Sequence, residues 1–576
     1  MTQRHTRRAV LGFTAKAAGL AAAGLTGTTT AAATSGADPA TGTAPAAEAE
    51  TIADVDLAVV SDAGRLPNLD AAGRIIGMVD AHAHLTACAG FGGDMRCGTP
   101  FAPGGIRAAL APCDSHIGIR PGSLLEAIIG NTDPLSPDAS GWPAFSAWPR
   151  HNTLLHEQAY YQGIERAWRA GLRVVNTLLV SNRVITELYD AGRPCDEMDE
   201  IRAQARFIVD MQDYIDSLHG GPGQGWFRIA RTPADIRSIA AQGKLAVVLG
   251  TENSELFGGR AIGDVARITT SDVDAGLDEM VALGICNLFP VHKFDNAFGG
   301  VRFDTGLNGA AVNVGNLLST GHWWEVEAAV DGPPDNHQPL ADDSIARLLS
   351  GGHSEIPAGA VAPVYPAGPI RNVRGLTDLG RYLIEGMMRR GMIINVDHMS
   401  AKTATAVLDI AEAAGYAGVM SAHSWSDRSV LERTLALGGF AAGYANAACC
   451  QGGNRPTYVA EWQANRCGAS GSALAGYGFG SDVNGFGPQA APRLDAATHP
   501  LPYPFTAPNG TRFDRMRMGE RTFDLNTDGV AQYGLYADWY ADVVQVAGDA
   551  GPQLQQDMLN GAEAFVAMWE AARAWN

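Results

Sequence analysis

Short apolar runs alternate with amphipathic helical segments along most of this 576-residue chain, and this alternation restricts the fold more than any other feature. Such alternation is typical of βα units that build a parallel sheet. A chain of this length can close eight βα units into a ring and still carry long insertions. We therefore expect an α/β fold of the (β/α)₈ TIM barrel type. The candidate strands are residues 75–82, 173–180, 245–252, 286–292, 392–398, 419–423, 440–444 and 477–482.

Segments with a helical apolar stripe lie between these strands. Residues 154–170 and 553–574 show the stripe, and residues 377–390 also open with a Thr and stop before Gly391, which are common helix boundary residues. A ninth apolar run, residues 226–230, is short and leads into a helical segment that feeds a better strand. We therefore place residues 226–230 outside the barrel.

Two long segments rich in Gly, Pro and Trp interrupt the alternation, at about residues 85–150 and 293–372. They follow the first and the fourth candidate strand, so they leave the barrel at the C-terminal ends of strands. Active sites of TIM barrels lie at that face. We expect the two insertions to form a lid and the walls of a substrate site.

The N-terminal residues have the pattern of an export signal. Arg7 and Arg8 precede a mildly apolar stretch, and three Ala residues end the segment of residues 1–33. This pattern is typical of a twin-arginine signal, so we expect a secreted or periplasmic protein. Residues 34–52 are predicted to be a disordered leader, which leaves residues 53–576 for the barrel domain. No Cys lies near the predicted cleavage point and no other stretch of about 20 apolar residues follows, so we expect no membrane anchor.

The charge of the chain argues against nucleic-acid binding. The formal net charge is −19 at pH 7, and no cluster of Lys and Arg occurs beyond the first residues. Binding phosphates requires a basic patch. Eight Cys residues are compatible with disulfides in an exported protein, but their pairing cannot be read from the sequence. None falls in a CxxC pattern, so we expect no cysteine ligands to a metal ion.

Five of the candidate strands end in His, Glu or Asp. The first ends in VDAHAHL, which places His82 and His84 on one face because side chains i and i+2 of a strand point the same way. Two such imidazoles can bind one metal ion, although an HxH pair also occurs by coincidence in polar loops. Because barrel strands run parallel, all the strand-end residues are expected at one mouth. The other strand ends supply Glu252, His398, His423 and Asp482.

Several of these segments resemble the membrane (renal-type) dipeptidase family. GKLAVVLGTE, GLTDLGRYLIEGMMRRGMIINVDHMS, AHS and GFGSDVNG are similar to segments of that family in the same order. The resemblance extends over roughly residues 75–82 and 225–490, with gaps. It implies a metal-dependent barrel enzyme in which Glu252 bridges two metal ions, while His398 and His423 hold the second ion.

The chain departs from the family pattern in several places. The family has HxD on the first strand, where this chain has His84 in place of the acid, and a further motif aspartate is Asn395 here. The family motif GSDFDG reads GSDVNG. The Arg that binds a substrate carboxylate in the family has no clean match. Arg428 and Arg433 both follow His423 at suitable distances, and both remain candidates.

These patterns predict a metal-dependent hydrolase that cleaves an amide bond in a dipeptide or a small amino-acid derivative. Two divalent metal ions, with zinc favoured, are expected to activate a water, with His82 and His84 on one ion. The resemblance implies that His292 contacts the substrate and that Asp482 handles the proton of that water. Another amidohydrolase-type reaction at the same site, on a lactone, cyclic amide or D-amino-acid derivative, remains open. So does a catalytically inactive secreted binding protein on the same barrel, which would hold no metal.

Overall fold

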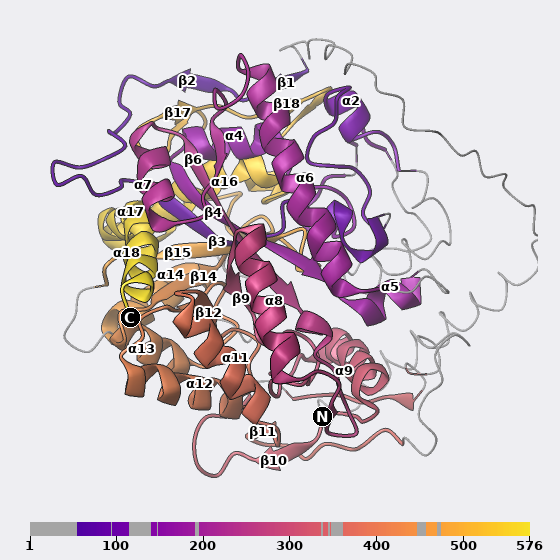
Figure 1. Ribbon diagram of the computed structural model, residues 1–576. Coiled ribbons are helices and arrows are strands. Elements are labelled where there is room, and N and C mark those ends of the chain that lie inside the picture. Colours follow the sequence, from indigo (N-terminus) through magenta and orange to yellow (C-terminus); the bar gives the residue numbers. More distant parts are fainter. Residues whose placement is uncertain are drawn as a thin grey trace, which may run out of the picture.

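The centre of the molecule is a closed ring of eight parallel strands (Figure 1). The computed structural model describes residues 54–93, 95–113, 140–146, 148–189, 195–335, 338–343, 346, 361–445, 457–468 and 474–575. The predicted (β/α)₈ TIM barrel is confirmed, because the last strand of the ring pairs with the first. In ring order the strands are β3 (Met78–Ala83), β4 (Leu172–Ser181), β6 (Leu245–Asn253), β9 (Ile285–Leu288), β12 (Ile393–Asn395), β13 (Val419–Ser421), β14 (Phe440–Tyr444) and β15 (Gly478–Val483).

The strands are buried on both faces, as barrel strands must be. Every residue of β4 and β6 is buried, because helices cover the outside of the ring and side chains fill its interior. The short strand β5 (Phe227–Ile229) pairs with the first residues of β6, whereas β9 pairs with β6 only from Leu249 onward. β5 is therefore a side branch, and the prediction that residues 226–230 lie outside the barrel is confirmed.

A layer of helices surrounds the ring (Figure 1). α11 (Asp378–Arg389) begins where the sequence predicts, because the Thr377 side chain accepts a hydrogen bond of 2.9 Å from the backbone N–H of Gly380. The other helices of this layer are α4 (Tyr161–Arg169), α5 (Arg183–Tyr189), α6 (Glu197–Leu218), α7 (Pro233–Ala241), α8 (Thr270–Leu283), α12 (Ala401–Ala414), α13 (Arg428–Ala436), α14 (Tyr458–Gly468), α16 (Tyr536–Val546), α17 (Gly551–Leu559) and α18 (Gly561–Arg573).

The helix predicted over residues 154–170 is shorter in the structure and begins at Tyr161. The preceding backbone pairs with the first insertion instead of forming a helical turn. The N–H of Cys97 donates to the carbonyl of Leu155 (2.8 Å), and the N–H of Glu157 donates to the carbonyl of Cys97 (2.7 Å). A nonlocal strand-like contact therefore replaces the first turns of the predicted helix.

Both insertions leave the barrel at C-terminal strand ends, after β3 and after β9. In the first, a disulfide joins Cys97 and Cys113. The second places a helix and a two-stranded antiparallel sheet beside the mouth of the barrel (Figure 1). Their elements are η1 (Ala87–Ala89), η2 (Phe91–Gly93), α2 (Ile106–Ala109), α9 (Gly306–Thr320), β10 (Val326–Ala328) and β11 (Ile370–Asn372).

The C-terminal segment packs against the first described residues rather than adding βα units. The single helix predicted over residues 553–574 is two helices, α17 and α18, because the N–H of Ala562 donates to the carbonyl of Gly77 (3.0 Å). Two small antiparallel sheets join β1 (Val55–Asp56) with β18 (Arg517–Met518) and β19 (Arg521–Thr522), and β2 (Val59–Ser61) with β17 (Arg512–Phe513) and β16 (Phe505–Thr506). The remaining short elements are η4 (Leu256–Gly258), β7 (Ala261–Ile262), β8 (Val265–Ala266), α15 (Leu525–Asp528), η6 (Tyr533–Leu535) and η7 (Gly548–Ala550).

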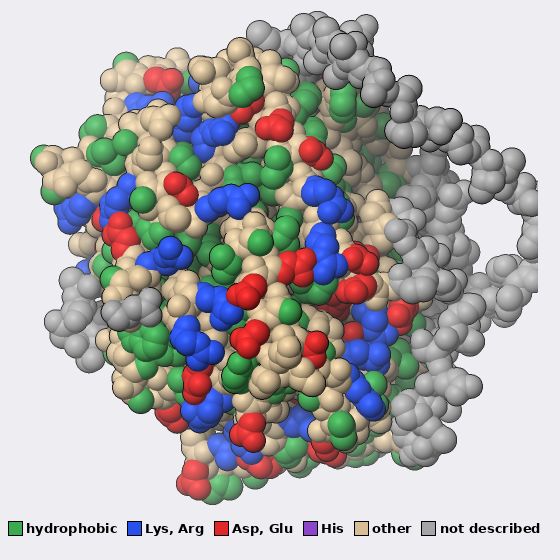
Figure 2. All heavy atoms as spheres, viewed as in Figure 1, with side chains coloured by type: hydrophobic (Ala, Val, Ile, Leu, Met, Phe, Trp, Pro, Cys, Tyr) green, Lys and Arg blue, Asp and Glu red, His purple; other side chains and the backbone are tan. Residues whose placement is uncertain are grey.

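The face of the molecule over α6 and α8 carries basic and acidic side chains side by side (Figure 2). Such interspersed charge is typical of a solvated surface. Within the described part of the chain, no helix combines the length and apolar character needed to cross a membrane.

Candidate metal centre

The residues predicted for the site meet at one mouth of the barrel, at the C-terminal ends of the strands. Six of them are 0–8% exposed, and the side chain of the seventh, Asp482, is 14% exposed. Their polar atoms therefore face one another rather than solvent. The seven are His82 on β3, His84 directly after β3, Glu252 on β6, His292 after β9, His398 after β12, His423 after β13 and Asp482 on β15.

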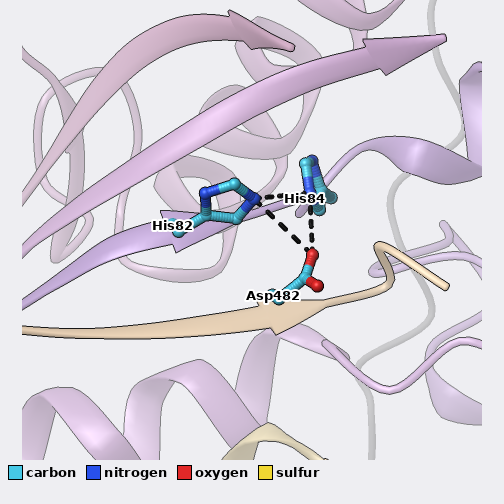
Figure 3. A group of neighbouring side chains, drawn as sticks. All are labelled: His82, His84 and Asp482. Carbon is cyan, nitrogen blue, oxygen red and sulfur yellow. Dashed lines mark hydrogen bonds and ion pairs between the residues drawn. The ribbon is translucent and has the colours of Figure 1, made fainter. Parts of the chain in front are cut away.

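Three of these side chains converge from neighbouring strands (Figure 3). Nε2 of His82 lies 3.1 Å from Nε2 of His84 and 3.5 Å from Oδ1 of Asp482, and Nε2 of His84 lies 3.2 Å from the same oxygen. The HxH spacing thus brings both imidazoles to one point, as the strand geometry requires.

Glu252 lies between two pairs of histidines. Its Oε2 is 3.4 Å from Nε2 of His82 and 3.3 Å from Nε2 of His84. Its Oε1 is 3.2 Å from Nε2 of His398 and 3.5 Å from Nε2 of His292. Each carboxylate oxygen therefore faces a different pair, which is the arrangement needed to bridge two cations.

His398 and His423 complete the second half of the cluster. Their Nε2 atoms are 3.0 Å apart, and the ring of His423 stacks on that of His82 with centroids 4.0 Å apart. Ligand atoms of His82, Glu252 and His423 lie within 4.8 Å of one another, and so do those of Glu252, His292 and His398. The two halves therefore share Glu252 and adjoin. His292 lies close enough to serve as a ligand as well as a substrate contact.

Hydrogen bonds on the outer ring nitrogens fix the orientation of two histidines. Nδ1 of His84 lies 2.8 Å from the carbonyl of Leu178, and Nδ1 of His423 lies 2.9 Å from Oδ2 of Asp397. With Nδ1 as the donor, Nε2 is the ring nitrogen that faces the cluster in both residues. The Asp397 carboxylate also accepts the backbone N–H groups of Ala422 and His423 and the hydroxyls of Ser421 and Ser426.

The sequence analysis did not single out Asp397 or Tyr444. Asp397 directly precedes His398, whereas the dipeptidase pattern drew attention to Asn395, whose side chain accepts the N–H of Asp397 (3.0 Å). Tyr444 ends β14 and donates its hydroxyl to Oδ2 of Asp482 (3.2 Å). Its position at the end of a predicted strand is the sequence feature that could have identified it.

The backbone leaves the extended conformation at two of the site residues. His398 has a φ of 64° and Asp482 a φ of 50°, in the left-handed region that non-glycine residues rarely adopt. β15 also shifts its register against β3 between Gly480 and Val483. Such irregularities turn a side chain away from the direction that a regular strand would give it.

Both carboxylates of the cluster are ionised. Burial by itself raises the pKa of Glu252, but the combined interactions with the surrounding imidazoles outweigh burial and hold the pKa well below its usual range. Burial likewise raises the pKa of Asp482, and the hydrogen bond with His84 outweighs it, so the net shift is downward. Two negative charges therefore lie buried at the mouth of the barrel.

Most of the imidazoles with a shifted pKa are neutral. Burial lowers the pKa of His82, lowers that of His292 to about 3, and lowers that of His398 well below its usual range. Burial also lowers the pKa of His84, but its hydrogen bonds with Asp482 and Glu252 outweigh burial and raise the pKa to about 10. One imidazolium thus balances part of the carboxylate charge, and a divalent cation would replace that proton.

The donor set fits divalent metal ions. Imidazole and carboxylate ligands at bonds of about 2.0–2.1 Å in a tetrahedral site place neighbouring ligand atoms about 3.3 Å apart. The Nε2 pairs at 3.0 and 3.1 Å and the nitrogen–oxygen pairs at 3.2–3.5 Å are close to that spacing. Oε1 of Glu252 is also buried without a hydrogen-bond partner, although polar atoms in such positions are normally satisfied.

Arg428 and Arg433, the two candidates for binding a substrate carboxylate, each pair with acidic side chains outside the cluster. Both lie on α13, because the chain enters that helix only five residues after His423. Their side chains are 51% and 30% exposed. Arg428 pairs with Glu432 on the same helix, and Arg433 pairs with Asp409 and Glu412 on α12.

Fold and site together define a (β/α)₈ barrel with a two-part cluster of histidine and carboxylate side chains, which could hold metal ions, at its C-terminal mouth. No protein-family model matches the chain, and no curated protein sequence matches it. Solved structures that resemble it include metallopeptidases. An amidohydrolase from Pseudomonas aeruginosa is 14% identical, with 71% of this chain and 92% of that chain covered and a TM-score of 0.37.

The metallopeptidase dipeptidase AC is 13% identical, with 72% of this chain and 89% of that chain covered and a TM-score of 0.40. A metallopeptidase from Rhodobacter sphaeroides, liganded with a phosphinate mimic of the dipeptide L-Ala-D-Ala, is 13% identical. That match covers 58% of this chain and 79% of that chain, with a TM-score of 0.34. Similarities this distant carry no argument about the activity of this chain.

Proposed function

We propose that this chain is a metal-dependent hydrolase that cleaves an amide bond in a dipeptide or a small amino-acid derivative. The observation that carries the proposal is the position of Glu252, whose two oxygens face two different pairs of histidines. His82, His84 and Glu252 would hold one divalent ion, and Glu252, His398 and His423 would hold the other. Two such ions would supply the polarisation of a scissile carbonyl and the acidification of the attacking water.

Asp482 moves the proton in this mechanism. Its carboxylate is ionised, and Oδ1 lies beside His84 and His82 at 3.2 and 3.5 Å. The Tyr444 hydroxyl holds the other oxygen, so the carboxylate has a fixed orientation. A positioned carboxylate of this kind accepts the proton of the attacking water and delivers it to the leaving amine.

His292 donates to the substrate carbonyl as negative charge develops on the carbonyl oxygen. Burial lowers the pKa of His292 to about 3, so the ring is neutral and carries a single N–H donor. It lies at the start of the second insertion, with Nε2 3.5 Å from Oε1 of Glu252. A preformed donor at this position stabilises the oxyanion without reorganisation during the reaction.

The proposal also includes zinc as the metal and export of the protein from the cytoplasm. Histidine and carboxylate ligands suit zinc, and the paired Arg7 and Arg8 direct the folded, metal-loaded protein out of the cytoplasm. Residues 1–53 lie outside the described structure. Replacing both arginines by Lys should retain the protein in the cytoplasm, and export that continues unchanged would contradict the twin-arginine route.

Glu252→Gln tests the proposal most directly. The substitution keeps the size of the side chain and removes the charge that both ions share. Bound metal should fall from two ions toward one or none, and turnover should fall by several orders of magnitude. Glu165→Gln is the matched control, because Glu165 is also buried but pairs with Arg169 on α4, away from the cluster. It should keep both its metal and its rate.

Metal content and turnover are measured on the same preparation, with a panel of dipeptides, lactones and cyclic amides as substrates. A Glu252→Gln protein that retains two ions and full activity refutes the bridging role. Hydrolysis of lactones but not of any dipeptide would overturn the amide substrate while keeping the metal centre. A wild-type protein that binds no metal would overturn both.

A further inference from the structure

The chain turns soon after Asp482 (Figure 3), and this β15 turn, residues 484–487, packs against two side chains of the cluster. The N–H of Gly485 donates to the carbonyl of Asp482 (3.0 Å). A Cβ atom at Gly485 would lie 1.9 Å from Oδ1 of Asp482 and 2.6 Å from Cδ2 of His84. A Cβ atom at Gly487 would lie 2.7 Å from Oδ2 of Asp482. Backbone therefore lies close to both carboxylate oxygens, and a shift of the turn must change the position of Asp482 or His84.

The Asn484 side chain fastens the β15 turn to its surroundings. It is buried, and its Nδ2 donates to the carbonyl of His84 (3.3 Å) and to Oε1 of Glu157 (2.7 Å). Its Oδ1 accepts the N–H of Gln158 (3.2 Å). These bonds require two donor hydrogens and an acceptor on one short side chain, which an amide provides and a carboxylate does not.

Glu157 lies outside the barrel, in the segment whose backbone pairs with Cys97 of the first insertion. Its side chain is buried, and Oε1 also accepts the N–H of Ala159 (2.7 Å). Oε2 is buried without a hydrogen-bond partner in the described part of the chain. Burial raises the pKa of this carboxyl, and the charge of Arg96 opposes the shift. A carboxyl group that is buried and only half bonded is costly to the fold, and such costs are commonly retained at functional positions.

Arg96 of the first insertion holds the same turn from a second direction. Its guanidinium donates to the carbonyl of Asn484 and to that of Leu154 (2.7 Å). The guanidinium also lies over the ring of Phe486, 5.7 Å from the centroid. The β15 turn is therefore held by residues from the first insertion and from the segment that pairs with it.

We propose that Glu157 is a positioning residue for the metal centre. By accepting the Asn484 amide, it holds the β15 turn against His84 and Asp482 and so sets how tightly this half of the cluster binds its ion. This inference rests on the proposed function and deepens it, since it concerns the metal affinity of the same site. Nε2 of His84 lies 3.2 Å from Oδ1 of Asp482. A ligand set works only when its atoms are held within about 0.5 Å of the productive geometry, so a small shift of the turn is enough to weaken binding.

A reciprocal exchange of amide and carboxylate tests the pair. Asn484→Asp replaces the donor by a second carboxylate facing Glu157, and two like charges this close repel each other. Adding Glu157→Gln restores one amide and one carboxylate in the opposite order, so the new amide can donate to the new carboxylate. Asn509→Asp is the matched control. Asn509 is also buried, precedes a glycine and donates through Nδ2 to the carbonyl of Arg169 (2.8 Å), which precedes β4 at the opposite end of the barrel.

Competition with a chelator of known strength measures the number and the affinity of bound zinc ions, and denaturant titration measures the free energy of unfolding. Asn484→Asp should weaken the binding of one ion by about tenfold or more, as is typical when a bond that supports a metal ligand is lost. The double variant should return to within about threefold of the wild type, because residues in contact do not act additively. Glu157→Gln alone should weaken binding less than Asn484→Asp, since its oxygen can still accept the Asn484 amide. Asn509→Asp should lower the free energy of unfolding and leave both affinities unchanged.

The rescue distinguishes positioning from a general loss of stability. The proposal is overturned if Asn484→Asp binds both ions like the wild type, or if the double variant binds metal no better than Asn484→Asp. Equal losses of affinity in Asn484→Asp and Asn509→Asp would overturn it too. If Asn484→Asp does not fold, the double variant decides: near-wild-type affinity supports the proposal, and failure to fold contradicts it. A wild type that binds two ions but hydrolyses no amide overturns the proposed function, whereas the exchange still decides the role of Glu157.

Discussion

Asp397→Asn tests whether the carboxylate behind His423 sets the strength of the metal centre. In the structure, Oδ2 accepts the N–H groups of Ala422 and His423 and Nδ1 of His423, whereas Oδ1 accepts only the hydroxyls of Ser421 and Ser426. An Asn side chain can keep its oxygen at the Oδ2 position and turn its amide toward the two hydroxyls, which rotate to accept. The backbone around His423 should therefore persist, and the negative charge alone is lost.

Loss of this negative charge should weaken mainly the binding of metal. A carboxylate bonded to the outer nitrogen of a metal-ligating histidine fixes the ring and makes it more basic, and removing such a partner typically lowers metal affinity by about 10- to 100-fold. This corresponds to about 1.4–2.7 kcal/mol of binding free energy. The weakened hydrogen bonds should also lower the free energy of unfolding, by about 1.5–3 kcal/mol at most.

Competition with a chelator of known strength measures the metal affinity, and denaturant titration measures the free energy of unfolding. Asp216→Asn is the control, because Asp216 is also buried and also accepts several hydrogen bonds, from Arg228 and from the backbone N–H groups of Gly223 and Gly225, near the end of α6. It should lose stability and keep its metal affinity. An Asp397→Asn protein that binds metal within about twofold of the wild type refutes the reasoning.

Three further predictions concern stability. Chelation should abolish activity and lower the Tm, since metal at about 1,000 times its Kd contributes about 4 kcal/mol; calorimetry with and without chelator checks this. Burial raises the pKa of Asp335 to about 6, above the unfolded value of about 3.9. Its contribution to stability is therefore fully present below about pH 4 and is lost as the pH rises through about 6, by roughly 3 kcal/mol. Asp335→Asn should remove that part of the pH dependence in denaturant titrations at pH 4 and pH 7. Cys97→Ser should lower the free energy of unfolding by about 3 kcal/mol, because the disulfide closes a loop with a sequence separation of 16; an unchanged denaturation midpoint would contradict this.

The barrel could be predicted because the sequence pattern of one βα unit recurs along the chain. Each strand is a short apolar run followed by a helical segment, so an error in one element does not change the architecture. All eight predicted strands are found in the ring, including β12, which is only Ile393–Asn395. Helix boundaries were less predictable. The start of α4 depends on a pairing with Cys97, which is distant in sequence and leaves no local pattern.

The cluster at the mouth could also be predicted, because strand direction alone brings strand ends together. The HxH pair and the acid or histidine at four further strand ends were enough to select six side chains that the structure brings together, and the family resemblance added His292. The groups that hold those side chains were less visible. Asp397 accepts a hydrogen bond from His423, which follows the next strand of the ring, and Tyr444 donates one to Asp482 on the next strand. Neither contact follows from spacing in the sequence.

The substrate side of the site depends on loops, and there the sequence was misleading. The family pattern directed attention to Arg residues after His423, and the structure shows these residues on α13, paired with acidic side chains. Contacts between two loops carry no periodicity, so only the structure reveals them.

The backbone at the strand ends gives an independent reason to regard this mouth as functional. His398 and Asp482 adopt left-handed φ values of 64° and 50°. For a residue with a Cβ this conformation costs about 1–2 kcal/mol, and glycine would remove the cost. Glycine would also remove the side chain that meets Glu252 or His84. Two backbone bonds hold His398 in place, its N–H to the carbonyl of Trp425 (3.2 Å) and its carbonyl to the N–H of Arg302 (2.8 Å). The fold thus tolerates strain at two of the positions where it delivers a metal-ligand side chain, and strain retained in this way is typical of functional sites.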